Sequence, residues 1–392
     1  MKENGLIFVP YQDTDNFFSD GILTREYAIL YLLYTYGFKK VINVKKPRTW
    51  LDKKRYTINE LYYPDGTIEN KVKSILEDCQ TIQYLPAFSL EQVVNRRGWW
   101  NNGYLKSYND LRRAMGKDDR YLVYSDNPFA YKLIEKLKEQ GCRIYFDIMD
   151  NFSIHPSLNE SERRLALQGY QKVLKIADVV SANSQQTCDS MQQYSDKKII
   201  LVKNGVFLEN EVKGIINISQ IEEINKAKGE FKRTAGYIGK IGKRLDADLI
   251  DKVSENCKDT LFVFVGPYLK GQMNDKLIRI FDNRKNVIHI EGVPSAYVYA
   301  ALNCFDILII PHAVGKNENG GDPLKLYQYL TRNKPIITTP ILGVDEFKEK
   351  ICIAKTENEW IEFINSDHNS VASISNEIKW EERFRDIIEL IK

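Results

Sequence analysis

Short apolar runs alternate with amphipathic stretches along most of the chain. In the first half, runs rich in β-branched and aromatic residues predict buried strands at 5–10, 39–44, 81–88, 120–126, 142–150, 178–184 and 198–206. Segments with a helical spacing of apolar residues lie between them, at 21–36, 127–140, 161–177 and 185–194. Strands that alternate with helices in this way predict a parallel sheet with helices on both faces.

The alternation restarts after a polar stretch at 209–232. Strands are expected at 234–242, 260–267, 287–292, 305–311, 336–339 and 351–355, and helices at 247–255, at 295–302 and shortly after residue 322. A chain of 392 residues has room for two domains. The sequence therefore predicts an α/β fold of two tandem, doubly wound, parallel-sheet domains at 1–206 and 207–374, followed by an amphipathic helix at 375–392. Because such sheets bind ligands beyond the carboxyl ends of their strands, we expect the site in the cleft between them.

The composition is that of an ordinary soluble globular protein. The apolar fraction is 43%, the charged fraction is 28%, and the net charge of only +3 argues against a nucleic-acid binder. The segment from Tyr36 to Lys117 is locally basic, with 16 Lys or Arg against 8 Asp or Glu. Such a surplus would attract an acidic surface, either anionic lipid or a phosphorylated acceptor.

Six cysteines and four histidines are scattered along the sequence, without the spacing of a zinc site or a disulfide framework. The N-terminal residues do not resemble a signal peptide, and no run of 18 apolar residues could form a membrane-spanning helix. We therefore expect a cytoplasmic protein without a metal or other cofactor, with peripheral contact to the cytoplasmic face of the membrane as an option.

The stretch at 317–339 joins a glycine-rich loop to a short helix and a β-branched strand. Asp322 is expected to cap the helix and Pro323 to occupy its first position. A glycine loop at a helix N-terminus presents free backbone N–H groups, which proteins use to hold phosphate. Lys325 and Gln328 are three residues apart and share a face of that helix. An ordinary capped helix before a buried strand is the alternative interpretation.

A second glycine-rich turn, GYIGKIGKR, occupies 236–244. Its glycine spacing, G-x-x-G-x-x-G, differs from the dinucleotide-binding pattern G-x-G-x-x-G. Lys240, Lys243 and Arg244 stand beside the glycines. A tight turn with three cations suits a diphosphate, which arginine can bind through two hydrogen bonds. A solvated basic turn is the alternative.

Carboxylates at the ends of two strands are candidates for a general base. Asp150 could accept the proton of an attacking hydroxyl, and Asp126 at the end of the preceding strand is the other candidate. Of Asp147 and Asp150, one is expected to be structural. Asp13–Asp15 and Asp246–Asp248 have the D-x-D form that can hold a divalent cation. We interpret both pairs as structural and predict no required metal.

The segment at 96–113, RRGWWNNGYLKSYNDLRR, mixes aromatic and basic residues. Arg96, Arg97, Trp99 and Trp100 lead it, and rings beside cations suit a membrane interface or a lipid-linked acceptor. Single-stranded nucleic acid would suit the same mixture, and a large loop packed by its own aromatics is the remaining alternative. We predict acceptor or membrane contact and no nucleic acid.

With both halves interpreted, the sequence resembles GT-B-type glycosyltransferases, in particular the bacterial group 1, family 4-like enzymes that build capsule, O-antigen and other surface polysaccharides. The resemblance covers 120–392 and rests on the order of GYIGKIGKRLDADLI, LFVFVGP, VIHIEGVPSAYVYAALNCFDILIIPH, DPLKLYQYLTRNKPIITTP and WEERF. It implies an acceptor-binding N-terminal domain, a C-terminal domain that binds a nucleotide-sugar, and a last helix that packs back on the N-terminal domain.

The resemblance also implies roles for single residues of the donor site. It places the side chains or backbone of these residues on the donor: Gly239, Lys240, Arg244 and Lys325 at the diphosphate, Val293 at the base, Asn319, Gly320, Gly321 and Asp322 at the sugar and phosphate, and Gln328 at the ribose. Many relatives carry glutamates where this chain has Gly320 and Gln328. The amide of Gln328 can still bond two hydroxyls, but the missing acids leave the donor sugar and the stereochemistry open.

The activity implied is metal-independent transfer of a sugar from a nucleotide-sugar, a UDP-sugar, to a hydroxyl of a growing glycan, in one version carried on a polyprenyl diphosphate. Domain closure would exclude water, and the cations would stabilise the leaving diphosphate. Asp150 would accept the proton if the reaction inverts; if it retains, the diphosphate itself would assist. The alternatives are a non-catalytic sugar- or lipid-binding scaffold and a dinucleotide-dependent oxidoreductase.

Overall fold

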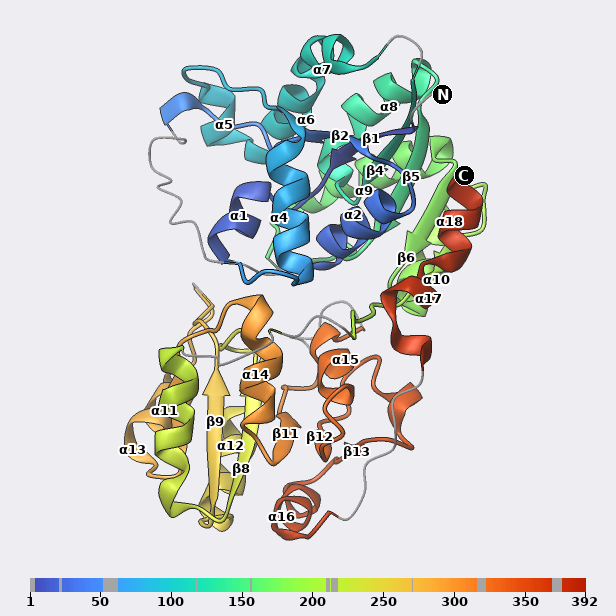
Figure 1. Ribbon diagram of the computed structural model, residues 1–392. Helices are drawn as coiled ribbons and strands as arrows, with labels where there is room; N and C mark the ends of the chain where they lie inside the picture. The colour runs from blue at the N-terminus through green and yellow to red at the C-terminus, as the bar shows by residue number, and fades with distance from the viewer. Residues whose placement is uncertain are drawn as a thin grey trace. The chain divides into compact units, whose positions relative to one another are not determined.

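The computed structural model describes residues 4–20, 23–51, 63–116, 119–155, 157–208, 212, 218–269, 271–315, 322–368 and 376–392. The chain divides into two compact units (Figure 1). The first contains Met1–Lys203 together with Trp380–Lys392, and the second contains Asn204–Lys379. Each unit is built on its own parallel sheet.

The first unit has a seven-stranded sheet in the order β3-β2-β1-β4-β5-β6-β7. The strands are β1 (Asn4–Val9), β2 (Lys40–Val44), β3 (Gln80–Ile82), β4 (Arg120–Ser125), β5 (Arg143–Ile148), β6 (Val179–Ala182) and β7 (Ile200–Leu201). Strand β1 pairs in parallel with both β2 and β4, so Leu6 lies opposite Val41 on one side and Leu122 on the other. The strand order reverses here, which makes the carboxyl ends of β1 and β4 the switch point where ligands of such sheets bind.

Helices cover the two faces of this sheet, so its central strands are continuous apolar runs. They are α1 (Thr14–Asp20), α2 (Arg25–Thr35), α4 (Ile68–Asp78), α5 (Leu90–Val94), α6 (Arg96–Lys106), α7 (Tyr108–Ala114), α8 (Tyr131–Glu139), α9 (Glu160–Ile176) and α10 (Gln185–Gln192), with a 3-10 turn at Pro128–Ala130. In α9, a capping box of Asn159 and Glu162 fixes the first turn, and Ala166, Tyr170 and Val173 face the core.

The second unit has a six-stranded sheet in the order β10-β9-β8-β11-β12-β13. Its strands are β8 (Arg233–Ile238), β9 (Thr260–Val265), β10 (Val287–Ile290), β11 (Ile307–Ile310), β12 (Ile336–Thr338) and β13 (Cys352–Ile353). Its helices are α11 (Ser219–Ala227), α12 (Ala247–Asn256), α13 (Asp275–Asn283), α14 (Val298–Asn303), α15 (Leu324–Leu330) and α16 (Glu357–Asn365). Short 3-10 turns lie at Lys228–Glu230, Ser295–Tyr297 and Asp345–Phe347. Here the switch point lies between β8 and β11.

The prediction of two doubly wound parallel sheets is confirmed. The strand expected at 81–88 was largely wrong, because only residues 81 and 82 form, within β3 (Gln80–Ile82). The basic segment before 117 also contains α4, α5, α6 and α7, which the apolar pattern did not predict. The polar stretch at 209–232 includes a helix of the second unit, α11, because Ile221 and Ile224 supply a narrow apolar stripe.

The single helix expected at 375–392 is replaced in the described residues by a 3-10 turn at Asn376–Ile378, α17 (Trp380–Arg383) and α18 (Arg385–Ile391). Trp380 and Phe384 are buried in the first unit. The Arg25 guanidinium lies 5.5 Å from the Trp380 ring centre, and Phe384 packs beside Tyr145 of β5. These contacts make the last two helices part of the first unit's core.

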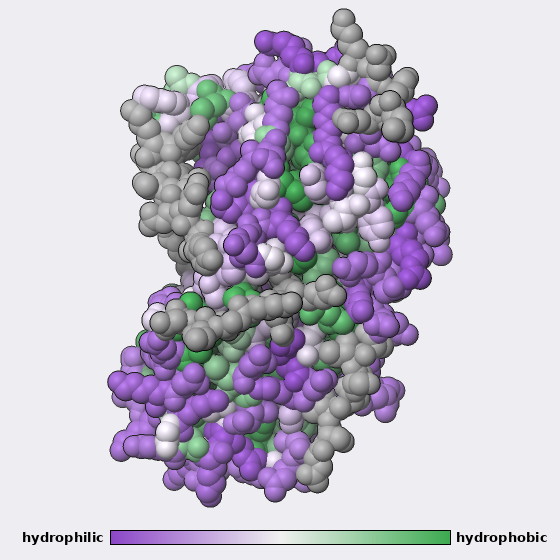
Figure 2. Space-filling model, viewed as in Figure 1, coloured by the Kyte–Doolittle hydropathy of each residue, from purple (hydrophilic) through white to green (hydrophobic). Residues whose placement is uncertain are grey.

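Hydrophilic residues cover most of the visible face of each unit, and hydrophobic residues show between them only in small areas (Figure 2). All six cysteines are free thiols. Within the described ranges, no helix combines the length and the apolar character that crossing a membrane requires.

Candidate functional site

The switch point of the second unit holds a group of polar side chains around Lys325. Lys325 lies in α15, Tyr237 in β8, and His312 follows β11. The Lys325 ammonium donates a hydrogen bond to the Tyr237 hydroxyl (2.6 Å) and lies 3.1 Å from His312 Nε2. The Tyr237 hydroxyl in turn donates to the carbonyl of Lys240 (3.2 Å). The four residues therefore form one hydrogen-bonded cluster at the carboxyl edge of the sheet.

Within the part of the chain that the structure describes, no acid neutralises the positive charge of this cluster. Lys325 and Arg244 form no ion pair with a described carboxylate, and Arg244 Nε is buried without a hydrogen-bond partner. Burial, reinforced by the Arg244 charge, holds the pKa of Lys325 well below its ordinary value. Burial and the two neighbouring cations likewise hold the pKa of His312 well below 6.5, so this imidazole is neutral at pH 7. Buried cations without an acid partner are suited to binding an anion.

The turn after β8 is held rigidly by backbone hydrogen bonds to the loop after β9. Gly239 N–H donates to Val265, Ile241 to Pro267 and Lys243 to Gln272, each at 2.9 Å. The N–H groups of the alternate residues, Lys240, Gly242 and Arg244, have no hydrogen bond within the described part of the chain. A turn that presents free N–H groups beside an arginine can bind phosphate oxygens.

Gly239 is required by this geometry. Its φ is +151°, and a Cβ at this position would lie 2.7 Å from Lys325 Nζ and 2.9 Å from the Tyr237 hydroxyl. Gly266 at the end of β9 has φ +150°, and its Cβ would lie 2.0 Å from the Gly239 carbonyl oxygen. The turn and Lys325 thus approach each other so closely that no larger residue fits.

The structure brings together three of the predicted donor-site residues, Gly239, Arg244 and Lys325. Lys240 belongs to the same turn, and its side chain is exposed. Gln328 lies one turn beyond Lys325 in α15, and its side chain is without a hydrogen bond among the described residues. Val293 follows β10 and packs partly against the core. The predicted contacts of these residues with a donor stay predictions.

Asp322 does not cap α15 as expected. The helix begins at Leu324 after Pro323, without a side-chain cap. The Asp322 carboxylate instead accepts hydrogen bonds from the backbone N–H of Asn204 and from the Tyr327 hydroxyl. These bonds tie the loop before α15 to the start of the second unit. The helix itself starts without a side-chain cap, because the fixed φ and the missing N–H of Pro323 already suit a helix start. Asn319, Gly320 and Gly321 lie outside the described residues.

In the first unit, Asp147 is the structural member of the Asp147 and Asp150 pair. Its carboxylate is fully buried and forms a two-pronged ion pair with Arg25, at 2.7 and 2.9 Å. Asp150 lies two residues beyond β5 and is only partly buried. Its carbonyl oxygen accepts a hydrogen bond from the Tyr170 hydroxyl (2.7 Å), which fixes the backbone there.

Asp126 is buried at the switch point of the first unit. One carboxylate oxygen accepts a hydrogen bond from Tyr11 N–H (2.7 Å), and the other has no hydrogen-bond partner. Glu26, in the first turn of α2, is also fully buried, and neither of its carboxylate oxygens has a partner. Burial and the nearby Glu26 charge hold the pKa of Asp126 well above its ordinary value. Burial raises the pKa of Glu26 to about 7.

Both D-x-D pairs contact other groups of the protein. Asp13 and Asp15 form ion pairs with Arg48, at 2.9 and 3.1 Å. Asp246 caps α12 by accepting from Leu249 N–H (3.0 Å), and Asp248 pairs with Lys276. The described residues contain no cluster of three His, Cys, Asp or Glu that could hold a metal ion.

The interpretation of Trp99 and Trp100 as rings exposed to a membrane was wrong. Both lie in α6 and are buried in the core of the first unit, because the helix turns its aromatic face toward the sheet. Arg96 stays exposed and Arg97 is largely covered. Exposed apolar side chains lie elsewhere in the unit, at Trp50, Leu51, Phe88, Leu90, Val93 and Val94.

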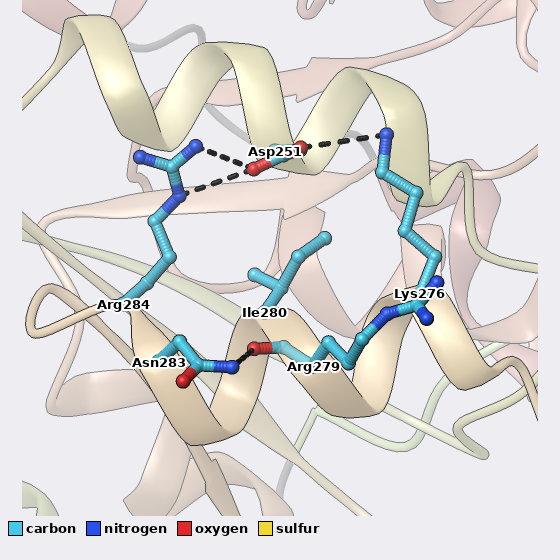
Figure 3. Close-up of a pocket in the computed structure, with 6 residues that line it drawn as sticks. All are labelled: Asp251, Lys276, Arg279, Ile280, Asn283 and Arg284. Carbon is cyan, nitrogen blue, oxygen red and sulfur yellow. Dashed lines mark hydrogen bonds and ion pairs between the residues drawn. The ribbon is translucent and has the colours of Figure 1, made fainter.

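A pocket of about 440 Å³ lies apart from these clusters, between α12 and α13 of the second unit (Figure 3). Asp251 stands between Arg284, which contacts it through Nε at 3.1 Å, and Lys276, at 3.4 Å. The basic residues of this pocket are thus partly neutralised, and the pocket shares no residue with the Lys325 cluster. We do not assign it to the site.

Sequence reasoning missed Tyr237, His312 and Glu26. Each carried a weak signal: His312 is polar and closely follows a buried strand, and Tyr237 lies at the end of a strand, beside the glycine turn. Glu26 is an acid in an apolar helix. Their roles depend on which side chains meet in space, which spacing alone does not reveal.

No family model matches the chain. Among curated proteins, TuaH of Bacillus subtilis (strain 168), named as a candidate teichuronic acid biosynthesis glycosyltransferase, is 23% identical over 216 residues. That match covers 54% of this chain and 50% of TuaH, so the chain spans about half the length of this curated relative.

Several solved structures share the fold. HepE from Anabaena, solved in complex with UDP-glucose, is 12% identical with a TM-score of 0.57, over 92% of this chain and 88% of HepE. Sucrose-phosphate synthase from Thermosynechococcus elongatus is 11% identical with a TM-score of 0.64, over 99% and 98%. A candidate UDP-N-acetylglucosamine 2-epimerase from Listeria monocytogenes is 10% identical with a TM-score of 0.54, over 100% and 96%. The chain therefore has the GT-B fold, with two Rossmann-like sheets.

Proposed function

We propose that this protein is a glycosyltransferase that moves a sugar from a nucleotide-sugar, a UDP-sugar, to a hydroxyl of a glycan acceptor. The fold, the named activity of TuaH and the UDP-glucose bound by HepE support this proposal. The observation that carries it is the unneutralised positive charge of Lys325 and Arg244 at the switch point of the second unit. A nucleoside diphosphate is an anion of matching charge, and it binds at this place in sheets of this kind.

In the proposed donor complex, the Lys325 ammonium and the Arg244 guanidinium contact the diphosphate, and the free N–H groups of the turn after Gly239 bond its oxygens. Lys240 adds a further charge from the rim. These groups are fixed before the donor binds, so they stabilise the diphosphate as negative charge develops on its leaving oxygen. This role needs no metal ion in the proposed reaction.

The remaining donor contacts are proposed from sequence position. Val293 would contact the base through its backbone, and Gln328 would bond the ribose hydroxyls from the same face of α15 as Lys325. Asn319, Gly320, Gly321 and Asp322 would lie near the sugar. Since both Asp322 carboxylate oxygens already accept hydrogen bonds, we propose that its contact with the donor is made by the backbone.

On the acceptor side, we propose Asp150 as the general base of an inverting reaction. Asp126 is buried, and one of its carboxylate oxygens already accepts a hydrogen bond from Tyr11 N–H, so an acceptor hydroxyl reaches it less readily. Asp150 is partly exposed and lies beyond the end of β5. In a retaining reaction, Asp150 would instead orient the acceptor hydroxyl.

We further propose that the protein meets the cytoplasmic face of the membrane through the α5 surface, defined by Trp50, Leu51, Phe88, Leu90, Val93 and Val94. These side chains are between 48% and 87% exposed. The backbone N–H of Trp50 donates to Pro86 (2.8 Å), which joins the two parts of the surface. Exposed Arg96 follows α5 directly. Apolar side chains beside a cation suit an anionic bilayer surface.

Sedimentation with vesicles of phosphatidylglycerol and phosphatidylcholine tests the membrane proposal. The Val93→Asp, Val94→Asp double variant should stay in the supernatant, whereas Met273→Asp, at an exposed apolar residue of the second unit, should sediment with the vesicles. Equal sedimentation of both variants would contradict the α5 surface as the contact.

Two other activities are open to this fold. An epimerase would change the sugar of the nucleotide-sugar without an acceptor, and a non-catalytic scaffold would bind it without turnover. A screen of nucleotide-sugars, with the products and their anomeric form followed by NMR, separates the three. We expect transfer or slow donor hydrolysis that is lost in Lys325→Ala and kept in Lys252→Ala, an exposed lysine of the same unit. Turnover unchanged in Lys325→Ala would refute the donor site.

A further inference from the structure

A second group of cations, in the first unit, converges on the ring of Trp100. The Arg97 guanidinium carbon lies 4.2 Å from the ring centre, the Lys46 ammonium 4.6 Å and the Arg96 guanidinium carbon 5.2 Å. Lys46 comes from the loop after β2, and both arginines come from α6. Three like charges held around one ring repel one another, so their close approach needs an explanation.

Acidic side chains neutralise little of this charge. The one ion pair of the group within the described ranges is a long contact of Arg97 Nε with Glu162 Oε1 (3.4 Å). The other carboxylate oxygen of Glu162 caps α9 by accepting from Asn159 N–H. Asp13, which also faces Lys46, is already paired with Arg48. Counted over the ion pairs of the described residues, three cations against one shared carboxylate leave a net charge of about +2.

The donors of these cations are also unsatisfied. Arg97 Nε and Nη1 are buried and without a hydrogen-bond partner, and the Lys46 ammonium forms no hydrogen bond among the described residues. Burial and the charges of Arg97 and Arg48 lower the pKa of Lys46 to about 8. The rings of Tyr11, Trp100 and Phe129 hold Arg97 in place by stacking, at 5.4, 4.2 and 4.9 Å. The cations are thus positioned by aromatic rings, with their donors still available.

The group lies at the carboxyl edge of the first unit's sheet, where a ligand is expected. Lys46 lies two residues beyond β2, and Tyr11 lies two residues beyond β1. Tyr11 joins the group to the switch point, since its ring contacts Lys46 and Arg97 while its N–H donates to Asp126. This is the unit to which the proposed function assigns the acceptor.

We propose that Lys46, Arg96 and Arg97 form an anion site that binds a phosphate group carried by the acceptor. A phosphate monoester carries a charge of about −1.5 to −2 at pH 7 and offers three acceptor oxygens, which matches the unneutralised charge and the free donors. A carboxylate offers one charge and would leave the site partly unneutralised. The assignment of this phosphate to the acceptor rests on the proposed function; the anion site itself rests on the first unit alone.

Calorimetric titration tests the site in a Lys325→Met background, which removes the anion site of the second unit. The probes are glucose 6-phosphate, farnesyl phosphate, glucuronate and glucose. We expect saturable binding of a phosphate probe, weakened at least tenfold by Arg97→Gln and by Lys46→Met. Arg113→Gln, at an exposed arginine paired with Asp110, should bind as the parent does. Binding of farnesyl phosphate alone would identify a lipid-linked phosphate, and equal binding of both phosphates a phosphate recognised by itself.

Three results would overturn the proposal: no binding of either phosphate, equal binding by the parent and both variants, or glucuronate binding as tightly as the phosphates. Because Arg97 packs against three rings, each variant is checked by thermal melting, and the exposed Arg96→Gln provides a variant that leaves the core intact. UDP titration of the protein with Lys325 intact tests the donor site separately. Failure of UDP to bind there would refute the proposed function and leave the anion site standing.

Discussion

Lys325 donates a hydrogen bond to the Tyr237 hydroxyl at 2.6 Å while its ammonium lies 3.9 Å from the centre of the same ring. The ring thus provides both a polar partner and a favourable face for the cation. Neither contact neutralises the charge, because a phenol that stays protonated carries none. Burial holds the pKa of Tyr237 well above 10, so its hydroxyl keeps its proton. The pair therefore holds a cation in place for an anion to bind.

Lys325→Met should raise stability and abolish UDP binding. Methionine keeps the length of the side chain and removes a partly buried charge that has no acid partner among the described residues. Replacing buried charges with well-packed apolar groups typically raises stability by about 1–4 kcal/mol. Differential scanning calorimetry and UDP titration of the same sample check both expectations. Lys252→Met, on an exposed face, should change neither. A lower melting temperature together with unimpaired UDP binding would contradict this account of the site.

UDP binding should be accompanied by proton uptake. The pKa of Lys325 is lowered in the free protein, and a bound diphosphate raises it again. UDP affinity should therefore fall as pH rises toward 10.5, because the bound diphosphate favours the ammonium form. Titrations in buffers with different ionisation enthalpies, repeated at several pH values up to about 10, measure the uptake. A binding enthalpy that is the same in every buffer at every pH would exclude it.

Gly239→Ala should destabilise the second unit and weaken UDP binding. The new Cβ would lie 2.7 Å from Lys325 Nζ, and alanine is strained at a φ of +151°. Strain of this kind costs about 1–3 kcal/mol, and displacement of Lys325 adds a loss of affinity. Gly229→Ala is the matched control, since its Cβ would meet no atom within 4 Å. Thermal melting and UDP titration of both variants decide the matter; equal behaviour would refute the close-approach argument.

Glu26→Gln should flatten the pH dependence of stability. The pKa of Glu26 is raised from 4.5 to about 7, so the folded protein holds the proton more tightly than the unfolded chain. This contribution is fully present below pH 4.5 and is lost as pH rises to about 7. At pH 8 the neutral glutamine avoids a cost of about 3 kcal/mol.

Urea unfolding at pH 5 and pH 8 measures the effect of Glu26→Gln. The parent should lose more stability between the two pH values than the variant, and Glu139→Gln, at an exposed acid of the same unit, should behave as the parent does. A variant that is as pH-dependent as the parent would show that Glu26 is not the titrating group.

Asp150→Asn should lower transfer by about 10²- to 10⁴-fold if the reaction inverts, with UDP binding unchanged. Asp126→Asn should have a smaller effect, because this buried carboxyl is less accessible to an acceptor hydroxyl and an amide keeps the bond from Tyr11 N–H. Rates with saturating donor, measured beside UDP affinity, compare the two. A larger loss in Asp126→Asn would reverse the assignment of the base.

The sequence predicts the layers of the fold well, because apolar runs such as those of β4 and β5, separated by helices, are typical of one parallel sheet. It also singles out the glycine turn and Lys325, because glycines beside cations after a strand form a local pattern. Asp322 was wrongly predicted to cap α15. Its carboxylate instead bonds Asn204 and Tyr327, and Asn204 lies 118 positions away in the sequence, where a local pattern cannot reveal it. Trp100 was placed on the surface, since periodicity within a short helix does not reveal which face the sheet covers.

The two groups of cations likewise combine a local pattern, which the sequence reveals, with contacts between distant residues, which it does not. Lys46 and Arg97 are 51 positions apart in the sequence, and only the approach of α6 to the end of β2 brings both to the Trp100 ring. Composition revealed the basic surplus of this region but not its convergence. Similarly, the meeting of Lys325, Tyr237 and His312 is a property of three elements packed together, which a linear pattern does not record.

The first unit takes its last two helices from residues 380–391, which follow the whole second unit in the sequence. A nascent chain that has emerged only to residue 379 can complete the second sheet but not the first, whose Tyr145 and Arg25 still lack Phe384 and Trp380. The second unit therefore has the opportunity to fold first during synthesis, the reverse of the usual order. Until residues 380–391 have also emerged, the side chains of the first unit that pack on Trp380 and Phe384 stay uncovered.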